Sequence, residues 1–426
     1  MINLQILKAL NDEITYVETL ESGLTVAIHP KLKYQRTLVT LQVNFGGMDI
    51  KYEVNNQTKT IPSGVAHFLE HSLFQNNGRN LTEEFAEYGA RINAFTTKSI
   101  TAYTFECRND FEHLITYFLS SFIKPDFSKA AIEKEKKIIK HELSMSEDSV
   151  HTKIYQKLKQ MMYTDCAIRC DVGGTVTDVN KTDQAVLNDV FDTFYHPKNM
   201  SLIITGNLDY LKTFELLRNH IYNQHAWPTY SEVKRIQDNQ PRILHNYTRK
   251  VEDVEENIIN IGIKIPEEYF NKYSREYIHI AIHSIIGNTF GLGSKNYDYL
   301  DKRKMMNISF SAKSTVERDY GFINIYMQSK QPDKYLKEIM TIIRNIKDKP
   351  LDEHLFTINK RAISGNYIRL FDSLGRTHEF ISNCLTEEVS IDNYLNNILK
   401  LDIKDLDPMK QIFEDKNIFT IKYLKR

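Results

Sequence analysis

Residues 64–71 read Gly-Val-Ala-His-Phe-Leu-Glu-His and carry two histidines and a glutamate at the spacing of a helix. His67 and His71 are four residues apart, so on a helix they lie one turn apart on the same face and can converge on a single ion. Glu70 falls three residues after His67 on that side, where its carboxylate can reach a water molecule beside the ion. We therefore predict a helix that presents two metal ligands and a general base.

This site needs a third ligand, because a hydrolytic zinc site holds three protein ligands and keeps one position open. The predicted helix 132–145 offers Glu135 and Glu142, which lie two turns apart on one face. We predict that Glu142 binds the metal and that Glu135 orients a ligand or accepts its proton. Alone, this lysine- and glutamate-rich stretch would be a solvated helix face, so the assignment depends on the two histidines. His141 points about 100° away from Glu142 and is the weaker candidate.

The order His-x-x-Glu-His is the signature of the inverzincin class of zinc peptidases. Two imidazoles and one carboxylate suit Zn²⁺, although Co²⁺ or Mn²⁺ could use the same ligands. We expect one zinc ion per chain and peptide-bond hydrolysis. The alternative for the motif is a chance match between surface histidines and a surface glutamate.

The order of the predicted elements indicates a duplicated α+β fold. Strand-like runs, a helix after Ser63, a short helix closed by Gly89 and two further strands form a β-β-α-α-β-β pattern, and a similar order recurs in the second half. Residues 195–203 and 413–421 are also similar to one another. We expect two similar domains, at 1–222 and 247–426. The residues between them, 223–246, carry two prolines and no sustained period, which is typical of a linker.

Composition restricts the kinds of partner. Lys plus Arg and Asp plus Glu are equal at 55 each, so no net field favours nucleic acid or anionic lipid. No stretch is apolar and long enough for a membrane span, and the first residues lack the pattern of a secretory signal, so we expect a cytoplasmic protein. The four cysteines are too scattered for a disulfide framework, and Cys166 and Cys170 lack the further ligands of a structural zinc site.

The motif and its surroundings resemble the zinc-bearing subunits of the M16 peptidases, the family of pitrilysin, insulin-degrading enzyme and the mitochondrial processing peptidase. The resemblance rests on residues 64–74, on Glu135-x-x-Ile-Ile-x-x-Glu142, on residues 89–97 and on residues 195–206. In length the chain is similar to the short M16B class, and within that class it looks closest to the bacterial AlbF-like and YmfH-like groups. The resemblance implies two M16-type domains, each a mainly antiparallel sheet covered by helices.

The resemblance also implies a mechanism and a mode of substrate binding. Zinc would polarise the scissile carbonyl, and Glu70 would take a proton from water and pass it to the leaving amine. The strand 91–97 resembles the edge that pairs with an extended peptide in this family, which would bring Asn93, Ala94 and Phe95 beside the substrate backbone. An ordinary structural strand is the alternative for these residues. The substrate would be a short or unfolded peptide, for example a leader-bearing or bacteriocin-type precursor.

One departure from the family pattern bears on the partner. The second half of M16 proteins often carries an Arg and a Tyr that contact substrate, but here Arg303 is displaced by two positions and Phe310 lacks the hydroxyl. We therefore expect a heterodimer with a second M16-like chain that lacks the zinc motif, carries the Arg and Tyr and completes a two-chain chamber. The competing hypothesis is a non-catalytic structural or peptide-binding subunit, although such a subunit would have no use for a base at Glu70.

Overall fold

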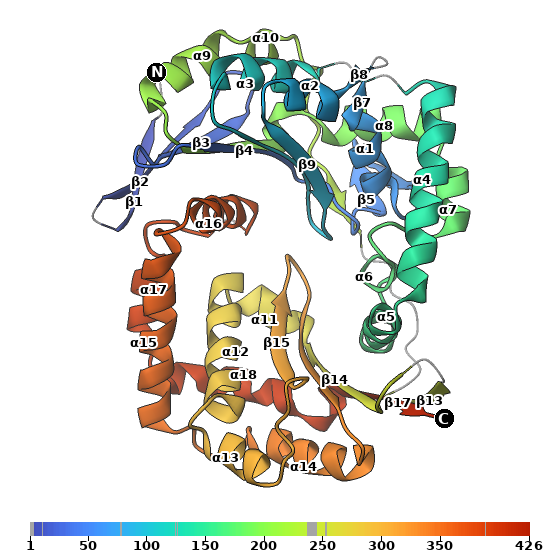
Figure 1. Ribbon diagram of the computed structural model, residues 1–426, viewed down its shortest axis with the longest axis vertical. Coiled ribbons are helices and arrows are strands. Elements are labelled where there is room, and N and C mark those ends of the chain that lie inside the picture. The colour runs from blue at the N-terminus through green and yellow to red at the C-terminus, as the bar shows by residue number, and fades with distance from the viewer. Residues whose placement is uncertain are drawn as a thin grey trace. The chain divides into compact units, whose positions relative to one another are not determined.

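A computed structural model describes residues 4–10, 12–76, 79–123, 125, 127–236, 245–251, 254–387 and 389–426. The chain divides into two compact units, each assembled from three separate segments. The first unit comprises Met1–Ser146, Cys170–Asp238 and Ile368–Tyr394, and the second comprises Glu147–Arg169, Asn239–Tyr367 and Leu395–Arg426. Each unit combines a mainly antiparallel sheet with helices, which confirms the predicted α+β class (Figure 1).

The first unit is built on a seven-stranded sheet of order β1-β2-β3-β11-β4-β10-β9. Only β3 and β11 run parallel, and the other neighbours are antiparallel. In sheet order the strands are Gln5–Leu10, Glu13–Thr19, Thr25–Pro30, Met200–Gly206, Thr37–Val43, Thr101–Cys107 and Arg91–Thr96. Two small sheets accompany it: β12 (Lys234–Arg235), β5 (Lys51–Val54) and β6 (Gln57–Thr60) form one, and β7 (Gln75–Asn76) and β8 (Arg79–Asn80) form the other.

Helices cover both faces of this sheet. The helices of the first unit are α1 (Val65–Phe74), α2 (Leu81–Glu87), α3 (Phe111–Ser120), α4 (Lys129–Asp148), α7 (Val176–Lys181), α8 (Gln184–Phe194), α9 (Tyr210–Asn219), α10 (Ile221–Gln224) and α16 (Leu374–Glu387), with a 3₁₀ turn η1 at Pro197–Asn199. Helix α16 lies on the opposite face from α3 and α9 and contacts β11 and β4 (Figure 1). There His378 bonds through Nε2 to the Thr40 hydroxyl at 2.7 Å and through Nδ1 to the Thr205 hydroxyl at 3.0 Å.

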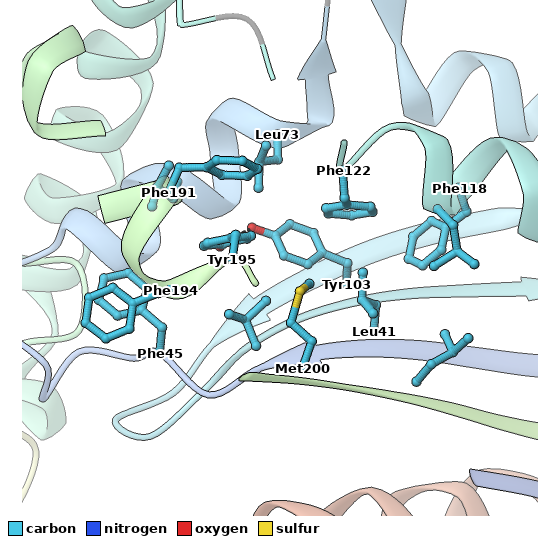
Figure 2. Close-up of a cluster of buried hydrophobic side chains, with 14 of the residues drawn as sticks. Leu41, Phe45, Leu73, Tyr103, Phe118, Phe122, Phe191, Phe194, Tyr195 and Met200 are labelled. Atoms are coloured by element: carbon cyan, nitrogen blue, oxygen red, sulfur yellow. Dashed lines mark hydrogen bonds between the residues drawn. The ribbon is translucent and has the colours of Figure 1, made fainter. Parts of the chain in front are cut away.

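The core of the first unit lies between the sheet and the helices that include α1 and α3. Aromatic rings from the sheet and from the helices interlock there, and the Tyr103 and Tyr195 hydroxyls share a hydrogen bond of 2.8 Å. Each large apolar side chain that is fully buried stabilises the fold by roughly 1.5–3 kcal/mol. Figure 2 labels part of this cluster: Leu41, Phe45, Leu73, Tyr103, Phe118, Phe122, Phe191, Phe194, Tyr195 and Met200.

The second unit repeats this topology on a smaller scale. Its sheet has the order β13-β17-β14-β16-β15, with β13 and β17 parallel and the other neighbours antiparallel. In that order the strands are Asn246–Val251, Ile418–Lys425, Ile258–Ile265, Gly321–Gln328 and Ser311–Val316. The five strands match β3-β11-β4-β10-β9 of the first unit in order and direction, so the predicted duplication is present in the strand topology.

The helices of the second unit pack on this sheet, with α12 against β15 and α5 against β14 and β17. They are α5 (Val150–Met162), α6 (Cys166–Arg169), α11 (Glu267–Lys272), α12 (Arg275–Phe290), α13 (Lys295–Lys302), α14 (Pro332–Asn345), α15 (Glu353–Leu370), α17 (Tyr394–Lys400) and α18 (Asp407–Lys410), with 3₁₀ turns η2 (Ile403–Leu406), η3 (Gln411–Phe413) and η4 (Asp415–Asn417). Within the described residues, no helix is both long and apolar enough to cross a bilayer.

Three helices are exchanged between the halves of the sequence. Helices α5 and α6 come from the first half but belong to the second unit, and α16 comes from the second half but belongs to the first unit. The domain boundaries at 1–222 and 247–426 therefore stay a prediction from the sequence. They describe two contiguous segments and do not include this exchange. Residues 237–244 of the expected linker lie outside the described residues.

Candidate metal centre

Helix α1 presents the motif on one face. Its buried residues are Val65, Ala66, Phe68, Leu69, Ser72 and Leu73. These residues seat one face of the helix on the core, and His67, Glu70 and His71 fall on the remaining face with intermediate exposure. Burial of one helical face, as the spacing predicts, therefore aims all three polar side chains the same way.

Helix α4 is seated in the same manner, because Ile132, Ile139 and Leu143 are buried. Glu135 is also buried, at 4% exposure, whereas the side chain of Glu142 is 46% exposed. Two carboxylates on one helix thus meet different surroundings, one enclosed by protein and one open to solvent.

The two helices bring the predicted ligands together. Glu142 Oε2 lies 3.5 Å from Nε2 of His71 and 3.9 Å from Nε2 of His67. The ligand atoms of these three residues all lie within 4.8 Å of one another, and they form the one such group of histidine, cysteine or acidic residues found in the described part of the chain. Around a tetrahedral zinc with bonds of about 2.0–2.2 Å, ligand atoms are spaced by roughly 3.3–3.6 Å, so this donor set fits zinc.

Glu135 has a different position from Glu142. Its Oε2 lies 3.3 Å from Nδ1 of His71, the ring nitrogen on the far side from Glu142. A carboxylate at Nδ1 keeps the proton on that nitrogen and leaves Nε2 free to bind a metal. The structure therefore brings His67, His71 and Glu142 together as a possible ligand set, with Glu135 behind one ligand.

The surroundings of the two histidines shift their pKa values in opposite directions. Burial lowers the pKa of His67 to about 4, with the neighbouring His71 adding to the effect and the charge of Asp171 opposing it. For His71 burial acts in the same direction, but the hydrogen bond with Glu135 and the charges of Glu142 and Glu70 outweigh it and raise the pKa. His67 is thus neutral near pH 7, the form in which imidazole binds a metal.

Glu70 lies beside the ligands without joining them. Its Oε2 accepts a hydrogen bond of 2.5 Å from the hydroxyl of Thr96 on β9. Burial raises the pKa of Glu70, and the hydrogen bond from Thr96 and the charge of His71 oppose that rise. A carboxylate with a raised pKa is closer to the proton affinity that a general base needs near neutral pH. Thr96 lies in the predicted strand next to Phe95, but a lone threonine in a strand carries no sequence signal for a place at the site.

Strand β9 is the edge of its sheet and pairs with β10 alone among the described strands. Asn93 and Phe95 are exposed on one face of β9, whereas Ala94 is partly buried and packs against the core. These three residues therefore do not share one face. The β9 edge that lies away from β10 is the feature that a peptide backbone could use.

Three further kinds of residue that the sequence offered, His141, Arg303 and the cysteines, are not part of the ligand group. His141 is exposed and is not a member of the ligand group. Arg303 ends α13, with its guanidinium 3.7 Å from the centre of the Tyr299 ring and a hydrogen bond to the Tyr299 carbonyl. Among the cysteines whose side chains are described, Cys107 and Cys384 are buried and Cys170 is partly buried.

Comparisons with protein families match both halves of the chain. Residues 35–172 match the family described as insulinase (peptidase family M16), and residues 182–363 match the family described as the peptidase M16 inactive domain. The first match contains the whole candidate metal centre, and the second begins after it.

Individual relatives agree with these matches. The chain is 26% identical over 395 residues to YmfH of Bacillus subtilis, which is named as an uncharacterized zinc protease. The aligned region covers 91% of this chain and 90% of that protein. It is 25% identical over 333 residues, or 76% of each chain, to AlbF of the same organism, also named as a zinc protease.

Solved structures share the fold. An M16-like peptidase from Alicyclobacillus acidocaldarius superposes with a TM-score of 0.91 at 22% identity, over 98% of this chain and 100% of that one. A protease from Helicobacter pylori superposes with a TM-score of 0.79 at 18% identity, over 96% of this chain and 99% of that one.

Proposed function

This chain belongs to peptidase family M16, and from that membership and the geometry at α1 and α4 we propose that it is a zinc-dependent endopeptidase acting on short or unfolded peptides. One observation carries the proposal. His67, His71 and Glu142 converge within 4.8 Å, and Glu70 lies on the same helical face. A binding subunit needs neither the ligand set nor the adjacent carboxylate, so this combination favours an enzyme.

In the proposed reaction, bound zinc supplies a Lewis acid that polarises a carbonyl oxygen and lets water lose a proton near neutral pH. Glu70 accepts that proton and returns it to the leaving amine. Thr96 assists by donating its hydroxyl to Oε2 of Glu70, which fixes the orientation of the carboxylate. Glu135 holds the imidazole of His71 through Nδ1, so that Nε2 stays directed at Glu142.

We infer that the substrate binds along β9. An extended peptide that adds to the edge of a sheet is held mainly by backbone hydrogen bonds, which tolerate many sequences. The edge of β9 that has no neighbour among the described strands is formed by residues that include Asn93, Ala94 and Phe95. It leads directly to Thr96 and from there to Glu70. Such binding suits peptides without tertiary structure, a class that includes leader-bearing precursors.

We also propose that a second M16-like chain completes the enzyme. Its role would be to supply the Arg and Tyr that this chain lacks, because Phe310 has no hydroxyl and the Arg303 guanidinium stacks on Tyr299. A chamber enclosed by two such chains would admit short or unfolded peptides and exclude folded proteins.

The test compares the wild-type chain with Glu70→Gln. Glutamine keeps the size of the side chain but cannot take a proton, so we expect about one zinc per chain in both proteins and a fall in kcat of about 10²–10⁴ in the variant. Zinc is counted by mass spectrometry, and cleavage is followed with an unstructured quenched peptide, with and without candidate partner chains.

The two readouts have separate meanings. A wild-type chain without zinc, or a Glu70→Gln variant as active as wild type, would remove the proposed function in favour of a binding subunit. Full activity of the isolated chain would remove only the requirement for a partner.

A further inference from the structure

The segment 170–175 is fixed against the start of α1 by backbone contact. Gly64 and Gly174 both have positive φ, at +85° and +76°. A Cβ on Gly64 would lie 2.3 Å from the carbonyl oxygen of Gly173, and one on Gly174 would lie 2.3 Å from that of Ser63. Neither position has room for a side chain, so the two backbones touch directly.

Further contacts hold the same segment. Lys98, which is 7% exposed, donates from Nζ to the carbonyl oxygen of Cys170 at 2.7 Å. Oδ1 of Asp171 accepts the N–H of Gly173 at 3.0 Å, and the carbonyl oxygen of Asp171 accepts the N–H of Gly174 at 3.2 Å. The position of Asp171 relative to α1 is therefore set by the fold.

His67 presents a buried polar atom toward this segment. Among the described residues its Nδ1 has no hydrogen-bond partner, although a buried ring nitrogen normally has one. A Cβ placed on Gly173 would lie 3.6 Å from Nδ1 of His67 and 3.6 Å from Oδ1 of Asp171. The two polar atoms thus lie equally near the same point, so the distance between them is at most twice 3.6 Å. The charge of Asp171 also acts on His67, opposing the effect of burial on its pKa.

We propose that Asp171 is a positioning residue for His67, whose carboxylate accepts the Nδ1–H of the imidazole, directly or through one water, in the space beside Gly173. This inference rests on the proposed function, because it matters only if His67 is a metal ligand. A proton held on Nδ1 leaves Nε2 free and directed at Glu142. Asp171 would then do for His67 what Glu135 does for His71, so each histidine would be oriented by its own carboxylate.

The test is zinc affinity, measured by competition with a chromophoric chelator, in Asp171→Asn. Asparagine keeps an oxygen that can accept the N–H of Gly173 but loses the charge, so the segment should keep its shape. We expect zinc to bind about 10–100-fold more weakly, the usual effect of losing a partner behind a metal ligand, with the melting temperature of the metal-free chain unchanged. Gly173→Ala is a second variant, because its methyl group would lie 3.6 Å from each of the two polar atoms and 3.0 Å from Cδ2 of Leu143, and it should weaken zinc binding too.

Asp178→Asn is the matched control. Asp178 lies in the first turn of α7, close to the same segment, and accepts hydrogen bonds from Ser63 and from Thr175, the N-cap of that helix. It makes no contact with a ligand histidine among the described interactions. We expect it to lower the melting temperature and leave zinc affinity unchanged. Equal losses of zinc affinity in Asp171→Asn and Asp178→Asn would indicate a general distortion and overturn the proposal. Unchanged affinity in Asp171→Asn would overturn it as well.

A second readout does not depend on zinc or on cleavage. In the metal-free chain, the nitrogen chemical shifts of labelled histidine, with His67 identified by its loss in His67→Gln, report which ring nitrogen carries the proton. We expect Nδ1–H in wild type and a shift toward Nε2–H in Asp171→Asn. No shift between the two proteins would contradict the role of Asp171. Absence of zinc or of cleavage in wild type would instead contradict the proposed function.

Discussion

Helices α1 and α12 hold equivalent places in the two units, since each follows the strand β4 or β14 and precedes the edge strand β9 or β15. Each also carries two histidines four residues apart, His67 with His71 and His279 with His283. Within the described residues, only the first pair gathers a carboxylate ligand. Equivalent positions and equal spacing therefore do not make equivalent sites.

The orientation of each helix explains the difference. In α1 the residue three after the first histidine is Glu70, which is only partly buried and lies on the same face as the histidines. In α12 the corresponding residue is Ile282, which is fully buried. A charged group at that position of α12 would have to leave water without a partner, at a cost of several kcal/mol. The buried face of a helix therefore decides whether a glutamate can stand between two histidines at this spacing.

The sharpest test of this comparison replaces one histidine in each pair. His71→Ala should lose zinc and lower activity by at least about a thousandfold, because one of three protein ligands is gone. His283→Ala should keep about one zinc per chain and stay within about twofold of wild-type activity. Metal content by mass spectrometry and peptide cleavage measure both. If His283→Ala lost zinc, the two helices would not differ as we describe.

A smaller effect is expected from Glu135, the carboxylate that contacts Nδ1 of His71. The histidines of α12 have no such carboxylate among their described contacts. Glu135→Gln removes the charge beside Nδ1 of His71 while keeping the shape of the side chain. Zinc affinity should fall about 10–100-fold, and activity should recover at high zinc concentration. Chelator competition measures the affinity, and the Glu142→Ala variant, which loses a ligand outright, should not recover in this way.

The smallest effect concerns the pH dependence of stability and not metal binding. Burial lowers the pKa of His378, on α16 of the first unit, to about 3. The unfolded chain, with a histidine pKa near 6.5, takes up a proton before the folded chain does, so stability is full above about pH 6.5 and falls as pH drops toward 3.

At pH 5 this loss amounts to about 2 kcal/mol. Urea unfolding of the metal-free chain at pH 7.5 and pH 5.0 measures it, with His378→Gln as the variant that should lose this part of the pH dependence. An identical pH dependence in the two proteins would show that His378 is not the group responsible.

Much of the fold and of the candidate site could be predicted from local pattern. The helix after Ser63 and the strand 91–97 are observed as α1 and β9, and the similarity of residues 195–203 to 413–421 corresponds to two 3₁₀ turns that lead into β11 and β17. These features follow from the spacing of apolar residues and from turn chemistry. The strands β1 and β2 were not predicted, because a stretch of mixed polarity carries a weak periodic signal.

The candidate ligands, their spacing and the family could all be predicted from the amino-acid sequence, because the i,i+4 and i,i+7 intervals on two helices restrict which side chains can share a face. Only the tertiary structure decided that Glu142 meets both histidines while Glu135 lies behind His71, since both glutamates occupy the same helical face. It also decided the exchange of α5, α6 and α16 and the place of Asp171 beside α1. Each of these depends on contacts between residues distant in the chain, for which no local pattern carries a signal.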